Sequence, residues 1–193
     1  MKTKISSFIA VALMSSTALA QSQTSTMPMP RSYISAEGIR VGLVKPMLDM
    51  ELKMSVGGES STGKAKVDDG IGVAVGYAYL PIQDLGWSAS FVHSAGKIES
   101  LNIGISRIEG NLGLAFNEYC NIKGGINLSK LSGEEVFNKM GPGFGLQAGV
   151  GVQFTKNIGL DLNYLYLNQI GNIDGVNLMS KQTGFEVGVN GTF

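Results

Sequence analysis

The stretch SKQTGFEVGVNGTF, residues 180–193, gives the first indication of the fold. Read in steps of two, it places Phe185, Val187 and Val189 on one side, followed by Gly191 and Phe193. The intervening positions are polar or small: Glu186, Gly188, Asn190 and Thr192. Strict alternation over this length predicts a β-strand with one apolar and one polar face. The alternation continues to a terminal aromatic residue, whereas an ordinary domain ends in a few polar, frayed residues.

The first twenty residues have the layout of a secretory signal peptide. Lys2 and Lys4 form a positive segment, residues 8–14 form an apolar segment, and residues 18–20 (Ala-Leu-Ala) form a small-x-small cleavage site. The apolar run is shorter than the roughly 20 residues that a membrane-spanning helix needs. The residue directly after Ala20 is Gln21 rather than a cysteine, which argues against a lipoprotein. We expect cleavage after Ala20 and export across the inner membrane.

Composition favours one domain that lies in a membrane. Residues 21–32 are polar and contain prolines, so we expect a flexible lead-in there and a single domain over residues 33–193. Charged residues make up 16% of the chain, below the roughly 25% of soluble domains, and the 27 glycines are about twice the usual share. No apolar run after the signal peptide approaches the length of a spanning helix. Only a closed barrel could then cross a bilayer, because lipid leaves unpaired backbone groups unsatisfied.

Seven further segments alternate in the same way as the C-terminal one. They lie at about residues 33–44, 71–79, 87–93, 98–116, 122–130, 144–154 and 158–166. Short turns alternate with generally longer connections, of which the longest are residues 45–69, 131–143 and 168–179. This pattern predicts an all-β fold: an eight-stranded, antiparallel, up-and-down transmembrane β-barrel whose first and last strands pair. In the first long connection, we expect two strands that continue past the membrane and meet at a mobile tip, residues 57–63.

The fourth segment departs from a simple period of two. Its apolar residues occupy odd positions over residues 101–105 and even positions over residues 112–116. A period of two cannot change from odd to even without an extra residue. We therefore expect a β-bulge between Ser106 and Asn111.

The polar face of the strands distinguishes a membrane barrel from a soluble, lipocalin-like one. A soluble barrel would carry many charges on that face, but here Gly, Ala, Ser, Asn and Gln predominate. Small groups suit the narrow interior of an eight-stranded barrel. Aromatic residues should form two interfacial rims. Tyr79, Trp87, Phe116, Phe154 and Phe193 would lie at the short-turn end, and Tyr164 and Tyr166 near the opposite end.

The chain resembles the small outer-membrane β-barrel family that includes the OmpA transmembrane domain and OmpX/Ail-type proteins. The similarity rests on the strand ending at Phe193 and on residues 107–116 and 123–127, which resemble the family's fourth-to-fifth strand hairpin. It implies the outer membrane of a Gram-negative bacterium, contact with outer-membrane lipid, and recognition of the C-terminal strand by the barrel assembly machinery. These motifs are architectural, so they imply no catalytic residue, metal or cofactor. Neither the charge balance nor the resemblance gives a reason to expect nucleic acid as a partner.

Isolated charges on the inner face are the first candidates for chemistry. Arg40 lies seven residues after Tyr33, and Glu186 lies seven before Phe193. If the terminal strands pair in register, Arg40 and Glu186 should form an ion pair, because an isolated buried charge is costly. We expect this pair to join Glu109, Lys123 and Asp161 in a polar network that plugs the lumen. The alternative is an ion pathway, for which eight strands leave little room.

The remaining reactive residues have ordinary interpretations. His93, followed by Ser94, is faintly similar to the His-x-Ser motif of lipid A deacylases. Adjacent strand residues point to opposite faces, so we expect a surface histidine and no enzyme. The single cysteine, Cys120, cannot form an internal disulfide and should be a free thiol in a turn. Two pairs of adjacent acids in predicted loops should be solvated charge rather than calcium ligands: Asp68 with Asp69, and Glu134 with Glu135.

The predicted function follows from the fold rather than from a reactive group. We expect a non-enzymatic outer-membrane β-barrel protein with a structural or surface-interaction, adhesion-like role. The loops at residues 45–69, 131–143 and 168–179 would make the contacts, and their generic composition does not identify a ligand. The alternative is a narrow porin that passes small solutes or ions. A lipid A-modifying enzyme is the third possibility.

Overall fold

The computed structural model describes residues 34–155, 157–173 and 175–193, without the side chains of residues 34, 35, 68 and 69. The predicted signal peptide and lead-in, residues 1–32, lie outside this range. Eight strands and one short helix follow in sequence. They are β1 (Ile34–Val56), β2 (Glu59–Pro81), β3 (Leu85–Ile98), β4 (Leu101–Ala115), β5 (Cys120–Gly133), α2 (Glu135–Asn138), β6 (Gly143–Gln153), β7 (Ile158–Ile173) and β8 (Val176–Thr192).

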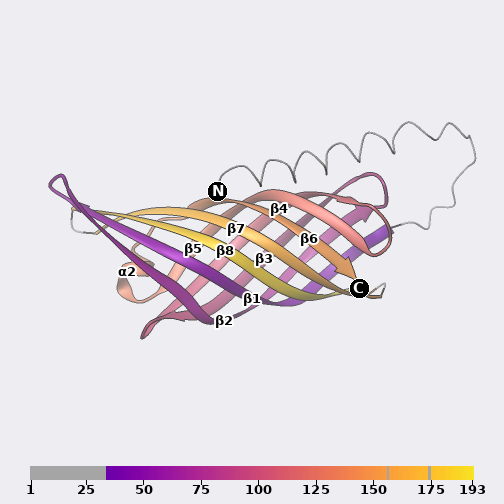
Figure 1. Cartoon of the computed structure of the whole chain (residues 1–193), viewed down its shortest axis with the longest axis horizontal. Coiled ribbons are helices and arrows are strands. Elements are labelled where there is room, and N and C mark those ends of the chain that lie inside the picture. Colours follow the sequence, from indigo (N-terminus) through magenta and orange to yellow (C-terminus); the bar gives the residue numbers. More distant parts are fainter. Residues whose placement is uncertain (1–33, 156, 174) are drawn as a thin grey trace, which may run out of the picture. The chain divides into compact units, whose positions relative to one another are not determined.

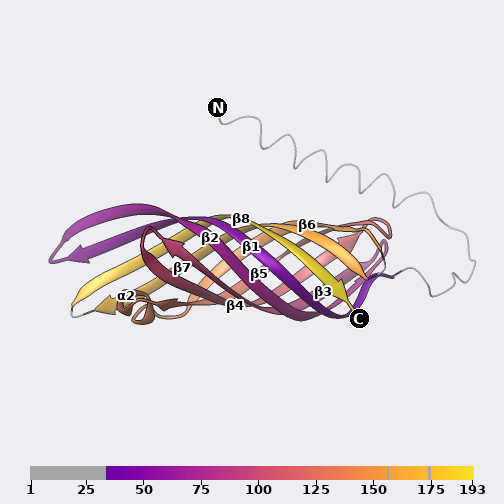
Figure 2. The ribbon, with the colours of Figure 1, turned by 90° about the horizontal axis from the view of Figure 1, so that it is seen from below.

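The strands form one closed, antiparallel barrel, as the sequence predicts (Figure 1). Each strand pairs with the next, and β8 pairs with β1, so that every strand has two neighbours. Following paired residues once around the barrel leads from Lys130 of β5 to Cys120 of the same strand, a shift of ten residues. Such a stagger requires strands inclined by about 40° to the barrel axis. Figure 2 shows that the strands run obliquely along the barrel.

The outer surface carries an apolar band along the part of the barrel next to the short turns. Its members are exposed aliphatic and aromatic side chains, among them Ile39, Val41, Leu43, Val75, Leu112, Ile126, Leu146, Val150, Leu162, Phe185 and Val189. The predicted aromatic rims border this band. At the short-turn end Trp87 stacks on Tyr77 with ring centroids 5.6 Å apart, and near the other end Tyr164 meets Phe185 edge-on at 5.3 Å.

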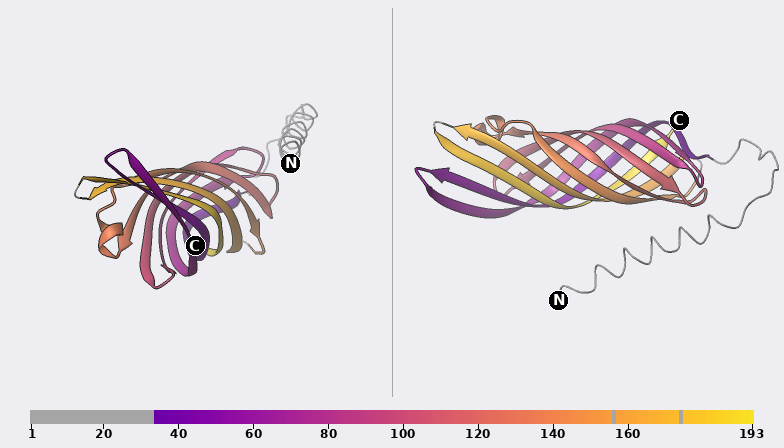
Figure 3. Two further views of the ribbon diagram at one scale, coloured as in Figure 1. Left: turned by 60° about the vertical axis from the view of Figure 1, so that its left-hand side comes forward. Right: turned by 90° about the horizontal axis from the view of Figure 1, so that it is seen from above.

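Strands β1 and β2 form a long hairpin that projects from the barrel at the end opposite the short turns (Figures 1 and 3). Each has 23 residues, and they meet in a turn at Gly57 and Gly58. Both glycines have positive φ, 57° and 96°, a conformation that favours glycine. Continuation of the strands past the band is therefore confirmed. The predicted tip at residues 57–63 was too long, because residues 59–63 pair with β1.

The third long connection is also paired strand. Residues 168–179 were predicted to form a loop, but β7 continues to Ile173 and β8 begins at Val176. The alternation of this segment is weak in sequence, and pairing with β8 supplies the backbone hydrogen bonds that hold it extended. Of the three predicted loops, residues 131–143 alone form a substantial connection, which includes α2.

The predicted bulge between Ser106 and Asn111 does not exist. Strand β4 pairs with β3 and with β5 without any shift in register. Ile103 and Ile105 consequently point inward and are buried, whereas Ile108 and Leu112 point outward. The apolar residues change from odd to even positions because the apolar face changes from the inside to the outside. One irregularity in register lies in β2 instead, where Val44 faces Gly72 but Leu48 faces Val67.

The end of the barrel opposite the short turns, called here the loop end, has an apolar interior. We call this cluster of buried side chains the apolar plug. It consists of Leu48, Met50, Val67, Ile98, Ile103, Ile105, Leu131, Phe137, Met140, Leu165, Leu167 and Leu178. Phe137 comes from α2, which lies at the same end as the projecting hairpin (Figure 2). The outer face at this level carries charged side chains, so the apolar residues turn inward to avoid water.

Candidate functional site

A fully buried arginine holds two carboxylates together in the middle of the lumen. Arg107 Nε donates to Glu109 Oε1 at 2.9 Å, and Nη2 donates to Glu186 Oε2 at 2.5 Å. Ser90 Oγ donates to the second oxygen of Glu109 at 3.2 Å. All three charged side chains are almost completely buried. Two like charges at such a site need a shared cation, and Arg107 supplies it with two separate N–H groups.

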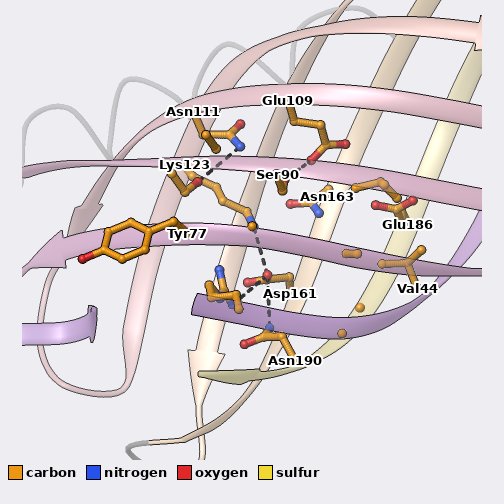
Figure 4. A pocket seen from close by; sticks show the side chains of 18 of the residues that line it. Val44, Tyr77, Ser90, Glu109, Asn111, Lys123, Asp161, Asn163, Glu186 and Asn190 are labelled. Carbon is orange, nitrogen blue, oxygen red and sulfur yellow. Dashed lines mark hydrogen bonds and ion pairs between the residues drawn. The ribbon is translucent and has the colours of Figure 1, made fainter. Parts of the chain in front are cut away.

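A second charged cluster is centred on Asp161 of β7 (Figure 4). Asp161 Oδ2 accepts from Lys123 Nζ at 3.0 Å and from Arg40 Nη2 at 3.1 Å. Asn190 Nδ2 donates to the same oxygen at 3.2 Å. The two clusters together contain three cations and three carboxylates, so the interior charge is balanced. Balanced, hydrogen-bonded charge is the form in which ionised groups are tolerated in a narrow lumen.

The predicted pairing of Arg40 with Glu186 is wrong. In the β1–β8 register, Arg40 faces Thr192 and Glu186 faces Pro46, so the two side chains lie at different levels. The prediction counted residues from Tyr33 and Phe193 and assumed that these positions are opposite each other. Closure of the barrel staggers the strands instead. The predicted network itself is present in two parts, with Glu109, Lys123 and Asp161 as members.

Arg107 is the member of the charged clusters that was not predicted from the sequence. It lies within the stretch where a bulge was expected, so the direction of its side chain was undefined. One signal was available, because Arg107 and Glu109 are two apart and therefore share a face of an unbroken strand. That face also contains Asn111, which is buried.

A small cavity lies between the two clusters. Its volume is about 60 Å³, enough for a few water molecules. Charged and polar side chains line it, including Arg40, Ser90, Glu109, Lys123, Asp161 and Glu186. Figure 4 shows Glu109 and Glu186 in the same interior as Lys123 and Asp161. Arg40 Nε and Arg107 Nη1 are buried without a hydrogen-bond partner, so these two N–H groups can still donate to water in the lumen.

The apolar plug separates this cavity from the loop end, and neutral hydrogen bonds fill the lumen beside it and at the wall of the cavity, which includes Asn111. Gln147 Nε2 donates to Asn111 Oδ1 at 2.6 Å, and Gln169 Nε2 donates to Ser129 Oγ at 3.0 Å. The plug residues Leu165 and Leu167 are 0% exposed. Lys130 Nζ donates to the backbone oxygen of Met140 at 2.9 Å and holds the segment after α2 against the plug. An apolar constriction without water opposes the passage of ions.

His93 lies on the outer face and forms a hydrogen-bonded pair with Ser106 of the neighbouring strand. His93 Nδ1 and Ser106 Oγ are 2.9 Å apart. Ser94 is buried on the opposite face, and its Oγ donates to the Ile105 backbone oxygen at 3.5 Å, so the predicted divergence of His93 and Ser94 is confirmed. Within the residues that the structure describes, no carboxylate hydrogen-bonds to the imidazole. The arrangement therefore lacks the third group of a hydrolase triad.

The other sequence candidates remain separate from the lumen. Cys120 is an exposed free thiol at the start of β5. Glu135 is exposed, and the Lys139 ammonium, hydrogen-bonded to it, holds the pKa of that carboxyl below its ordinary value. The side chains of Asp68 and Asp69 lie outside the described residues. In the described part of the chain, no group of three or more His, Cys, Asp or Glu is placed to hold a metal.

The projecting part of β2 has one unpaired backbone edge. Residues 59–67 pair with β1, but pairing with β3 begins only where Asp68 faces Lys97. Lys64 and Lys66 are exposed on one face of this segment, and Val67 is buried on the other. An unpaired edge presents N–H and C=O groups that can pair with another strand, and edge lysines limit unwanted pairing.

The model of the outer membrane protein beta-barrel domain matches residues 6–193, nearly the whole chain. No curated protein sequence matches this chain. Among the described residues, no helix is long and apolar enough to cross a membrane. The chain is similar to the solved structure of Neisserial surface protein A, with 22% sequence identity and a TM-score of 0.46. The match covers 81% of this chain and 97% of the Neisserial chain.

Two other solved structures are also similar. The attachment invasion locus protein Ail of Yersinia pestis has 16% identity, a TM-score of 0.38, and coverage of 80% and 99% of the two chains. The outer membrane protein OprG of Pseudomonas aeruginosa has 8% identity, a TM-score of 0.42, and coverage of 83% and 99%.

Proposed function

The chain belongs to the outer membrane protein beta-barrel family, and we propose that it is a non-enzymatic surface protein that binds an extracellular partner through the projecting β1–β2 hairpin. The barrel is the anchor in this proposal, and the loop end faces the exterior. The cleaved signal peptide and recognition of the C-terminal strand by the assembly machinery are parts of the same proposal. Family membership supports the role of the barrel as a membrane anchor. The geometry of the hairpin supports its role in binding a partner.

The observation that carries the proposal is the open edge of β2 over residues 59–67. An extended segment of a partner can add to such an edge through backbone hydrogen bonds, while alternate side chains provide specificity. The edge would present Lys64 and Lys66 on one side, so an acidic strand would fit it best. The edge lies within residues 45–69, the longest of the three predicted contact loops.

The test is adhesion of a non-adherent bacterial host that displays the chain, measured on cultured epithelial cells and on matrix-coated glass. In a shortened variant, Asn-Gly replaces residues 52–63. Glu51 then still faces Lys64, and residues 59–63 of the open edge are absent. We expect adhesion of the full chain and loss of adhesion in this variant. A matched control shortens the β7–β8 hairpin by removing residues 171–178 and adding the same turn. Equal adhesion of displaying and non-displaying cells would refute the proposal.

The narrow porin is the alternative, and the described lumen argues against it. The cavity of about 60 Å³ is separated from the loop end by the apolar plug. We expect the purified barrel to be silent in planar bilayers. Arg40→Ala and Glu186→Ala should be silent as well, because the plug lies beyond both residues. Steady conductance steps that change in either variant would favour the porin instead.

A further inference from the structure

A charged groove lies on the outer face of the barrel just beyond the apolar band. Its volume is about 470 Å³, and its lining comes from three neighbouring strands, β2, β1 and β8. The charged lining residues are Asp49, Glu51, Lys64, Lys66 and Lys181. Thr183 adds a hydroxyl group. A volume of this size accommodates a molecular headgroup rather than a single ion.

Strand register arranges these side chains in two parallel rows. In the first row Lys66 faces Asp49, and Asp49 faces Thr183. In the second row Lys64 faces Glu51, and Glu51 faces Lys181. Lys64 Nζ is 3.7 Å from Glu51 Oε2, and Lys181 Nζ lies 5.5 Å from the centre of the Tyr166 ring. Lys53, the next outward residue on β1, is exposed and adds a fourth lysine against two acids.

An apolar surface borders the groove on the side of the short turns. Thr183 faces Tyr166, and two residues further along β8 the exposed Phe185 meets Tyr164. Met47 of β1, which faces Phe185, is 48% exposed. A ligand that fills the groove and continues over these side chains must have a polar head and an apolar tail. Because the groove borders this apolar surface, an amphipathic ligand fits it better than a purely water-soluble one.

Exposed lysines and exposed acids both occur beyond the band at the loop end, among them Lys66, Lys97, Lys181, Asp49, Glu59 and Glu99. In the groove itself three lysines stand against two acids, so its lining carries a small positive excess. Basic residues beside a bilayer attract anionic headgroups within about a Debye length. The positive excess of the groove therefore points to an anionic lipid in the leaflet at the loop end.

We propose that the groove binds the phosphate-bearing headgroup of one lipid molecule, whose acyl chain lies over Phe185, Tyr164 and Met47. Lys66 and Lys181 donate to the phosphate oxygens, with Thr183, beside Lys181 on β8, as a third donor. Asp49 and Glu51 separate the lysines and reduce their mutual repulsion. This lipid site includes Lys64 and Lys66 of the unpaired β2 segment, but it uses their side chains on the outer face rather than the backbone edge. It therefore goes beyond the proposed surface contact.

The test is native mass spectrometry of the full barrel in neutral detergent with increasing amounts of a phosphorylated lipid, lipid A bearing phosphate groups. We expect a single bound lipid, and an affinity at least tenfold lower in Lys66→Gln/Lys181→Gln. The control, Lys97→Gln/Lys130→Gln, removes the same charge from β3 and β5, which do not line the groove, and should bind as the unchanged protein does. Heat-modifiable gel migration verifies that each variant is folded.

Three outcomes would overturn the lipid site. Undiminished binding in Lys66→Gln/Lys181→Gln would exclude these donors. An equal loss in the control would show that the whole basic rim attracts lipid without a defined groove. Competition by inorganic phosphate as effective as competition by the lipid would assign the groove to free phosphate. The hairpin variant lacking residues 52–63 should still bind lipid, which separates this test from that of adhesion.

Discussion

The two halves of the barrel have opposite polarity. In the half next to the short turns, Arg107, Glu186 and Asp161 lie inside while Leu112, Ile126 and Val189 lie outside. In the half at the loop end, Ile105, Leu131 and Leu167 lie inside while lysines lie outside. Each strand continues from one half into the other without leaving the sheet. The inversion therefore concerns the side chains and not the backbone.

The surrounding medium explains the inversion. Where lipid surrounds the barrel, apolar side chains gain nothing by turning inward, and the small interior can accept balanced polar groups. Where water surrounds it, the hydrophobic effect turns the apolar side chains inward, as in a soluble protein. The height at which the polarity changes marks the boundary of the membrane. Four experiments test this inversion of polarity, and each uses urea unfolding or hydrogen exchange of the barrel in lipid vesicles.

The largest loss of stability should come from a substitution in the charged half of the lumen, next to the short turns. Arg107→Met leaves Glu109 and Glu186 buried without their cation, and breaking such a pair costs about 3–5 kcal/mol. The urea midpoint, followed by the fluorescence of the single tryptophan Trp87, should fall accordingly. The triple variant Arg107→Met/Glu109→Gln/Glu186→Gln should recover much of the loss. An unchanged midpoint in Arg107→Met would mean that the ion pairs contribute little.

The apolar plug should be nearly as sensitive, although it contains no charge. Leu167 is 0% exposed, so Leu167→Ala leaves a cavity and should cost about 2–5 kcal/mol. Leu162 lies on the same strand but faces outward with 38% exposure. Lipid can fill the space in Leu162→Ala, so we expect a clearly smaller loss. Equal losses would contradict a dry, protein-filled interior at the loop end.

The outer face should show the reverse sensitivity to charge. Ile126→Arg places a cation in the middle of the apolar band and should cost about 2–4 kcal/mol. Asn102→Arg, at the exposed start of β4, should change the free energy of unfolding by less than about 0.5 kcal/mol. If both variants are equally stable, the outer face at Ile126 is in contact with water.

The smallest effect concerns the closure of the plug. Lys130→Gln removes the 2.9 Å hydrogen bond to the Met140 backbone oxygen and should cost about 1 kcal/mol. Hydrogen exchange of residues 134–142 should become faster while exchange in the strands stays unchanged. Lys97→Gln, another exposed lysine near the loop end, is the control. Faster exchange in both variants would indicate a general effect of charge.

Much of the fold could be predicted because a β-strand has a local signature. Phe185, Val187 and Val189 point outward and Glu186 and Asn190 point inward, as the period of two requires. The same rule placed His93 and Ser94 on opposite faces. It failed at Ile103 and Ile105, where the odd positions turn inward because the outer medium changes from lipid to water. A pattern of apolar residues does not say whether the apolar face of a strand meets lipid outside the barrel or other side chains inside it.

The candidate sites depended on register, which is not local. Arg40 joins Asp161 rather than Glu186 because the strands close with a stagger of ten residues, from position 130 to position 120. The same stagger brings Lys66, Asp49 and Thr183 from three strands into one row of the outer groove. No spacing within any one of these strands indicates that row.

By itself the sequence determined that the chain forms eight alternating strands, with small polar residues on one face and Phe193 at the end of the last strand. Side-chain alternation and composition are properties of short segments, so they can be read without knowing the neighbours. The tertiary structure alone decided which charges meet, where the apolar plug lies, and which edge of β2 stays unpaired. Those features arise from closure of the barrel, which sets the level of every strand relative to all the others.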